Sequence, residues 1–143
     1  MKYSEIKEII NLANQLDIDK TELFNYVNKQ DESFELDNYK FITEQESLKE
    51  VINMHEGDPY ILGCFNASFL CDYLPLDYDD IKTMQENESN FEILGKLVLN
   101  SGELENMMEE YIRLDGYGHA LGSYDHSYDE ITLNNIDYIY MRI

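Results

Sequence analysis

The stretch ITLNNIDYIYMRI, residues 131–143, decides the fold, because it predicts two strands joined by a tight turn at the end of the chain. Asn134 and Asn135 separate the two predicted strands, and such a pair is typical of the two-residue turns that close β-hairpins. Isoleucine, threonine and tyrosine flank the pair, as is usual in strands. We therefore expect a small antiparallel sheet at the C-terminus, with a further short strand at YKFI, residues 39–42.

Upstream of this hairpin, apolar residues recur at helical spacing. Ile6, Ile9 and Ala13 mark a helix over about residues 3–16, and Asp19 with Glu22 forms a capping-box pattern ahead of a second helix over about 20–29. Further helices are expected over about 43–55, 59–74, 78–86, 90–99 and 103–114. The fold class is therefore α+β, a mostly helical single domain with a small C-terminal antiparallel sheet.

Three segments are expected along the chain. Residues 1–30 form an N-terminal helical pair with the character of a helix-turn-helix corner. Residues 31–38, DESFELDN, combine four acids with turn-forming residues and predict an acidic loop or linker. Residues 39–143 then form an acidic α+β body.

The run from Pro59 to Leu74 is apolar on nearly all sides, which predicts one central buried helix that ends at Pro75. Cys64 and Cys71 lie seven residues apart in this run, two helical turns. We therefore expect both on one face of the helix as reduced core thiols, rather than as metal ligands or a disulfide.

The charge of the chain is extreme. Thirty Asp and Glu residues against ten Lys and Arg residues give a formal net charge of −20, whereas a magnitude of about 2–8 is enough to keep a small domain soluble. Because 43% of the residues are hydrophobic and are interleaved with the acids, the composition indicates a folded acidic protein and not a disordered tail. The excess charge favours electrostatic steering toward a basic surface.

The expected location is the cytoplasm of a bacterial host cell. The first fifteen residues carry acids early and form an amphipathic run, which is unlike a signal peptide. No stretch approaches the roughly 20 apolar residues of a membrane span, so no membrane partner is expected.

Residues 12–27 fit the apolar spacing of a helix-turn-helix, with Ala13 at the small position. Asp17 occupies the position where a tight-turn glycine is expected, and the second helix offers only Lys20 and Lys29 as bases. Direct DNA reading requires phosphate neutralisation, so it stays the less favoured alternative to a helical corner packed on the body or docked to a protein.

The segment DGYGHALGSYDHSYDEI, residues 115–131, gathers His119 and His126 with several carboxylates. These groups suggest a general base or a divalent-metal site, but their spacing matches no defined ligand set. The alternative is that the glycines make turns, the tyrosines pack and the acids face water. No catalytic residue, metal ligand or cofactor is assigned on this basis.

Runs of acid without any base indicate where a partner would bind. Five acids and no base lie between Arg113 and Arg142, and seven acids and no base lie between Lys49 and Lys82. Carboxylates spaced along one face would imitate nucleic-acid phosphates, so that a basic groove built for DNA or RNA would accept the protein; the alternative is an ordinary solvated face.

The runs DPYILGCFNASFLCDYL, residues 58–74, DGYGHALGSYD, residues 115–125, and DYIYMRI, residues 137–143, resemble small acidic proteins carried by bacteriophages and mobile elements. YIRLDGYGHAL, residues 111–121, is similar to the acid-rich ends of antirestriction proteins. The resemblance covers about residues 39–143 and excludes the N-terminal helical pair. It implies a counter-defence protein of the antirestriction or anti-CRISPR type, and it carries over no catalytic residue.

The favoured hypothesis is a non-enzymatic inhibitor of a host defence nuclease, a CRISPR effector or restriction enzyme, which acts through an acidic surface that mimics nucleic acid. Its partner is a basic nucleic-acid-binding host protein, with no direct nucleic-acid contact and with a homodimer left open. The alternatives are a helix-turn-helix regulator or adaptor, and a small metal- or His-dependent enzyme centred on residues 115–130. The expected partner-binding residues are Asp72, Asp77, Asp79, Asp80, Asp115, Tyr117, Tyr124, Asp125, Tyr128, Asp129 and Glu130.

Overall fold

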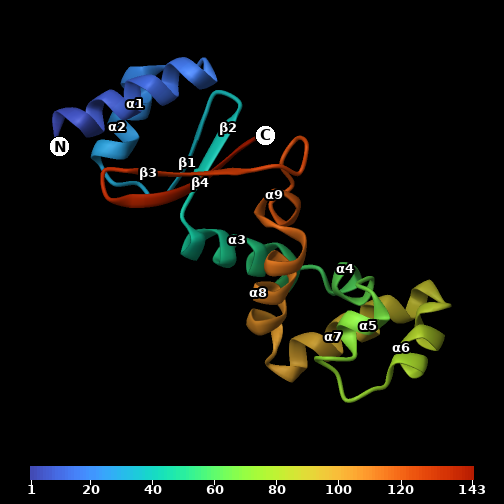
Figure 1. The fold of residues 1–143 in the computed structure, drawn as a ribbon. Helices are drawn as coiled ribbons and strands as arrows, with labels where there is room; N and C mark the ends of the chain where they lie inside the picture. Colours follow the sequence, from blue (N-terminus) through green and yellow to red (C-terminus); the bar gives the residue numbers. More distant parts are fainter. The chain divides into compact units, whose positions relative to one another are not determined.

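The computed structural model describes all residues from 1 to 143 and has an α+β fold that is 58% helical with one four-stranded antiparallel sheet (Figure 1). The predicted fold class is confirmed. The chain forms two compact units: unit 1 comprises residues 1–47 and 115–143, and unit 2 comprises residues 48–114.

Unit 1 contains the sheet, the two N-terminal helices and the short helix α9. Its elements are α1 (Tyr3–Leu16), α2 (Lys20–Asn28), β1 (Ser33–Leu36), β2 (Tyr39–Ile42), the first turn of α3 (Glu44–Glu56), α9 (Tyr117–Ala120), β3 (Asp129–Leu133) and β4 (Ile136–Arg142).

Unit 2 is helical throughout. Its elements are the remainder of α3, α4 (Pro59–Gly63), α5 (Ala67–Leu70), α6 (Tyr78–Gln85), the 3-10 turn η1 (Glu88–Asn90), α7 (Phe91–Ser101) and α8 (Leu104–Asp115), whose last residue falls in unit 1.

The strand order in the sheet is β1-β2-β4-β3. The C-terminal hairpin forms as expected: Leu133 pairs with Ile136, and Asn134 and Asn135 adopt left-handed φ angles of 52° and 64°. Asparagine tolerates this conformation, and its twist matches that of the flanking strands. The strand predicted at YKFI is also present, as β2.

Residues 31–38, expected as a loop or linker, contain strand β1, so that prediction is wrong for this segment. Phe34 and Leu36 are buried, whereas Ser33 and Glu35 are exposed. The acids that suggested a loop therefore occupy the solvent-facing positions of a strand with the period-two alternation of a half-buried sheet.

The core of unit 1 lies between the sheet and the helices α1 and α2. Rings stack along one face of the sheet, with centroid separations of 4.9 Å for Phe34 and Phe41 and 5.5 Å for Phe41 and Tyr140. Tyr138 meets Phe34 edge-on at 5.8 Å, and its hydroxyl donates to the carbonyl of Asp31 at 2.6 Å. The helices contribute Ile9, Leu12, Ala13, Leu23 and Val27 to the same cluster.

The predicted central helix over 59–74 is broken, which corrects that prediction. α4 ends at Gly63 and α5 begins at Ala67. The side-chain amide of Gln85 on α6 donates to the carbonyls of Gly63 and Phe65, at 2.8 and 2.7 Å, and so satisfies backbone acceptors that a continuous helix would have used.

The break also separates the two cysteines. Both thiols are free, but Cys64 is exposed and Cys71 is only partly buried. The expectation that both belong to one face of the core is therefore wrong, because the turn between α4 and α5 removes the common helical register.

Candidate functional site

The carboxylates lie at the surface of both units. Twenty-three of the thirty Asp and Glu residues are exposed, seven are partly buried and none is buried. Unit 1 has sixteen acids against six bases, and unit 2 has fourteen against four. Each unit alone therefore presents a strongly negative surface to solvent.

The predicted acids of unit 2 gather at the start of α6. Asp77 caps this helix by accepting a hydrogen bond from the backbone N–H of Asp80 at 2.8 Å, and Asp79 and Asp80 occupy the first turn. Acids at a helix N-terminus are stabilised by the helix dipole, so this cluster has a structural role in addition to any binding role. Asp72 follows α5 and is exposed like the other three.

The remaining predicted residues belong to unit 1. Asp115 ends α8 and Tyr117 begins α9, Tyr124, Asp125 and Tyr128 lie in the loop that leads into β3, and Asp129 and Glu130 begin β3. Asp125 accepts hydrogen bonds from the hydroxyl and the backbone N–H of Ser127, at 2.6 and 3.1 Å, and these bonds hold the pKa of its carboxyl below the usual value. Tyr124 is 73% exposed, and the guanidinium of Arg142 lies 5.0 Å from its ring centroid. This loop therefore presents an ordered acidic turn with an exposed aromatic ring beside it.

His119 and His126 are brought together, with their ring centroids 4.8 Å apart. Nε2 of His119 lies 3.9 Å from a carboxylate oxygen of Asp115. All three side chains are exposed, and no three His, Cys, Asp or Glu side chains in the chain are arranged to hold a metal ion.

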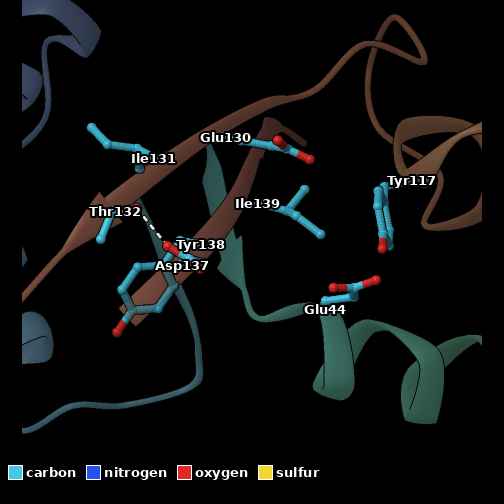
Figure 2. A pocket seen from close by; sticks show the side chains of 8 residues that line it. All are labelled: Glu44, Tyr117, Glu130, Ile131, Thr132, Asp137, Tyr138 and Ile139. Carbon is cyan, nitrogen blue, oxygen red and sulfur yellow. Dashed lines mark hydrogen bonds between the residues drawn. The ribbon is translucent and has the colours of Figure 1, made fainter. Parts of the chain in front are cut away.

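A hollow of about 480 Å³ opens on the face of the sheet opposite the aromatic core, and we call it the acidic hollow. Figure 2 shows the carboxylates of Glu44 and Glu130 and the ring of Tyr117 around the side chain of Ile139. Beside them, the hydroxyl of Thr132 donates a hydrogen bond to the carboxylate of Asp137. The lining residues are Glu44, Tyr117, Glu130, Ile131, Thr132, Asp137, Tyr138 and Ile139, with no base among them.

The surroundings of Tyr117 in the acidic hollow change the pKa of its phenol. Burial and the neighbouring negative charge of Glu44 raise the pKa of Tyr117 to about 12, with a smaller contribution from Glu130. The phenol thus stays neutral and directs its hydroxyl toward the Glu44 carboxylate (Figure 2). Such a hollow is suited to an ammonium or guanidinium group.

Only part of the acidic hollow was foreseen from the sequence. Tyr117 and Glu130 were among the predicted residues, whereas Glu44, Thr132 and Asp137 were missed. A two-residue turn at Asn134-Asn135 fixes Thr132 opposite Asp137, so these two could have been placed from the hairpin register.

Two of the predicted tyrosines are also brought together: the rings of Tyr117 and Tyr128 meet edge-on, with their centroids 5.4 Å apart.

The N-terminal helices form a corner around Asp17, whose φ of 56° is left-handed. This is the conformation expected of the glycine in a helix-turn-helix, so the backbone fits that motif although the residue does not. Lys20 and Glu22 on α2 are exposed, as is Lys29 directly after this helix.

Comparison with known protein families, curated proteins and solved structures gave no match. None of the helices combines the length and the apolar character needed to cross a bilayer. What supports a function is therefore the charge and the geometry of this chain.

Proposed function

We propose that this protein binds the basic, nucleic-acid-gripping surface of another protein through its exposed carboxylates. In its specific form, the proposal is a phage or mobile-element inhibitor that occupies the nucleic-acid channel of a host defence nuclease, a CRISPR effector or a restriction enzyme. The inhibitor acts in the bacterial cytoplasm and carries out no chemistry itself.

The observation that carries this proposal is the placement of the charge. None of the thirty acids is buried, so the net charge of −20 is directed to solvent and is not neutralised inside the fold. The ion pairs between side chains include exposed ones on single helices, such as Lys96 with Glu92 and Arg113 with Glu110. Water and salt screen exposed pairs of this kind and they contribute little to stability, so they do not account for so large an excess of acid.

A nuclease-inhibition assay tests the proposal. Cleavage of labelled DNA by representative restriction enzymes and RNA-guided nucleases is measured with increasing protein at several salt concentrations. We expect inhibition of at least one enzyme, with an apparent affinity that weakens about tenfold or more between 50 and 200 mM salt, because several charge contacts are screened together. Inhibition that does not change with salt would contradict charge mimicry.

Two triple variants separate local charge from net charge. In unit 1, Asp125→Asn with Asp129→Asn and Glu130→Gln removes predicted contact residues, and Asp17→Asn with Glu22→Gln and Glu35→Gln removes the same charge elsewhere. All six side chains are exposed, so folding should be preserved in both variants. We expect inhibition to weaken at least tenfold in the first and about twofold in the second; equal losses would reject the predicted contact residues.

A DNA-reading regulator is the second candidate, favoured by the left-handed Asp17 at the helical corner. A mobility-shift assay with the protein alone and the promoter DNA of its own operon separates the two functions. The inhibitor requires no shift in this assay, and a sequence-dependent shift abolished by Lys20→Ala with Lys29→Ala would favour the regulator.

A catalytic role for the paired histidines is tested in the same inhibition assay. Replacing His119 and His126 with Ala leaves inhibition intact if the protein is a binder. Loss of inhibition in this variant, with an unchanged circular dichroism spectrum, would favour an enzyme.

A further inference from the structure

The strand β3 is an edge of the sheet. It pairs with β4 on one side only, at the end of the order β1-β2-β4-β3. An edge strand presents backbone N–H and C=O groups that can pair with another extended segment.

The register identifies which residues of β3 present these groups. In an antiparallel pair, residues that exchange hydrogen bonds alternate with residues that do not, and a two-residue hairpin closes on an exchanging pair, here Leu133 with Ile136. Asp129, Ile131 and Leu133 therefore direct their backbone groups toward β4. Glu130 and Thr132 direct theirs away from the sheet.

Two hollows flank this edge, one on each face of the sheet, and both include Ile131 and Thr132 in their walls. The first is the acidic hollow. The second has about 350 Å³ and lies between β3 and α1, where Leu12 supplies apolar surface beside Glu8 and two amide side chains. Because side chains of an added strand would alternate between the faces, each set would meet one hollow.

The charges around the edge select the occupant. Asp129 and Glu130 lie on β3 itself, and Glu44 and Asp137 lie in the acidic hollow, whereas neither hollow is lined by a base. A second copy of this strand would bring its own Asp129 and Glu130 to an edge that already carries acids, and the repulsion disfavours pairing of two copies. An extended segment with basic side chains on one face and apolar side chains on the other complements both hollows.

We propose that the free edge of β3 accepts an extended basic segment of the partner protein as a fifth strand of the sheet. Its lysine or arginine side chains enter the acidic hollow, and its apolar side chains lie against the hollow beside α1. This inference rests on the proposed function, because it gives the mode by which an acidic inhibitor holds its cationic partner.

The probe is the peptide acetyl-Thr-Lys-Val-Arg-Val-Lys-Thr-amide, titrated into the full-length ¹⁵N-labelled protein. We expect the amide signals of Glu130 and Thr132 to shift most, and their hydrogen exchange to slow at least tenfold at saturation. Two control peptides are used: one is N-methylated at alternate residues and cannot donate to the edge, and the other has Glu in place of Lys and Arg. Each should bind at least tenfold more weakly.

Two proline variants locate the contact on the protein. Thr132→Pro removes an N–H that faces away from the sheet, a place where edge strands tolerate proline, and Ser33→Pro does the same at the opposite edge, on β1. We expect Thr132→Pro to weaken peptide binding at least tenfold and Ser33→Pro to change it less than twofold. If Thr132→Pro does not fold, the N-methylated peptide provides the same test on the unaltered protein.

The outcomes separate this inference from the proposed function. If Thr132→Pro and the N-methylated peptide both bind as tightly as their unaltered counterparts, in a salt-dependent way, then strand addition is overturned while charge capture survives. If the Glu peptide binds as tightly as the basic peptide, the proposal that the occupant is a basic segment is overturned. Nuclease inhibition without any peptide binding also overturns strand addition, and the absence of both inhibition and peptide binding overturns the two proposals together.

Discussion

The two units of this protein achieve tight packing by opposite means. In unit 1 the interior is filled by large side chains: the rings of Phe34, Phe41 and Tyr140 stack along one face of the sheet, and helices α1 and α2 cover them. In unit 2 the helices α4 and α7 approach so closely that side chains are excluded. A Cβ built on Gly63 would lie 1.8 Å from the carbonyl oxygen of Phe91, and one built on Gly95 would lie 1.7 Å from that of Pro59.

This difference indicates how each unit responds to substitution. A core of interdigitated rings loses stability in proportion to the volume removed, because neighbouring side chains relax only partly into the space. A contact between backbones has no side chain that can move aside, so even one added methyl group must separate the helices. Unit 1 should therefore be sensitive to truncation and unit 2 to enlargement.

The largest effect is expected for Gly95→Ala in unit 2. The added methyl group overlaps the backbone of Pro59, so α4 and α7 must move apart, and we expect a loss of about 5 kcal/mol in the free energy of unfolding. Urea unfolding followed by circular dichroism measures the loss. Hydrogen exchange should rise first in peptides from residues 48–114.

Gly57→Ala is the matched control in unit 2. Only the carbonyl oxygen of Asn53 lies within reach of a Cβ there, at 4.0 Å, and the φ angle is not positive. The substitution should leave stability within about 1 kcal/mol of the unaltered protein. A loss at Gly95 no greater than at Gly57 would show that the backbone contact is not what holds these helices.

The next largest effect is expected in unit 1, for Phe41→Ala. Phe41 is fully buried and contacts Phe34, Tyr138 and Tyr140, so truncation leaves a cavity among rings and should cost about 3–4 kcal/mol. Phe41→Leu keeps most of the side-chain volume, and its loss in the free energy of unfolding should be less than half of the loss for Phe41→Ala. Hydrogen exchange should now rise first in residues 1–47 and 115–143; a rise of equal size in both units would mean that the two units unfold together.

Elements held by neighbouring residues could be predicted from the sequence, whereas elements held by distant residues could not. The hairpin at Asn134-Asn135 and the cap at Asp19, whose side chain accepts from the N–H of Glu22 at 2.9 Å, depend on neighbouring residues alone. Both follow from local backbone preferences. The break between α4 and α5 depends on Gln85, which lies 22 and 20 residues from the two carbonyls that it bonds, and on the backbone of α7. Periodicity within residues 59–74 could therefore not reveal the break.

The candidate site divides in the same manner. Exposure of the acids could be predicted from charge alone, and Thr132 could be placed opposite Asp137 from the hairpin register. Glu44 joins the acidic hollow only because β2 pairs with β4, a contact between residues about one hundred positions apart. In strand β1, the alternation of Phe34 and Leu36 with polar residues indicates a strand, whereas the four acids of residues 31–38 are typical of a loop, so the two signals conflict.

A smaller effect, confined to unit 1, is expected for Tyr138→Phe. The ring stays in the aromatic core, but the hydrogen bond from the hydroxyl to the carbonyl of Asp31 is lost, which should cost about 1 kcal/mol. Tyr124→Phe removes a hydroxyl from a ring that is 73% exposed and should change stability by less than about 0.5 kcal/mol. If Tyr138→Phe and Tyr124→Phe shift the urea midpoint equally, the hydrogen bond to Asp31 contributes nothing to stability.

The last expected effect is a loss of stability of unit 1 at alkaline pH. Burial is the main cause that raises the pKa of Tyr117 and of Tyr138 to about 12, with neighbouring carboxylates adding to it. An unfolded tyrosine ionises near its ordinary pKa of about 10, so the unfolded state releases these protons first. The stabilisation is therefore complete below pH 10 and is lost as pH rises from 10 to 12. Urea unfolding across this range should show unit 1 weakening, and Tyr117→Phe with Tyr138→Phe should flatten the dependence; an unchanged slope would mean that these two phenols do not titrate with folding.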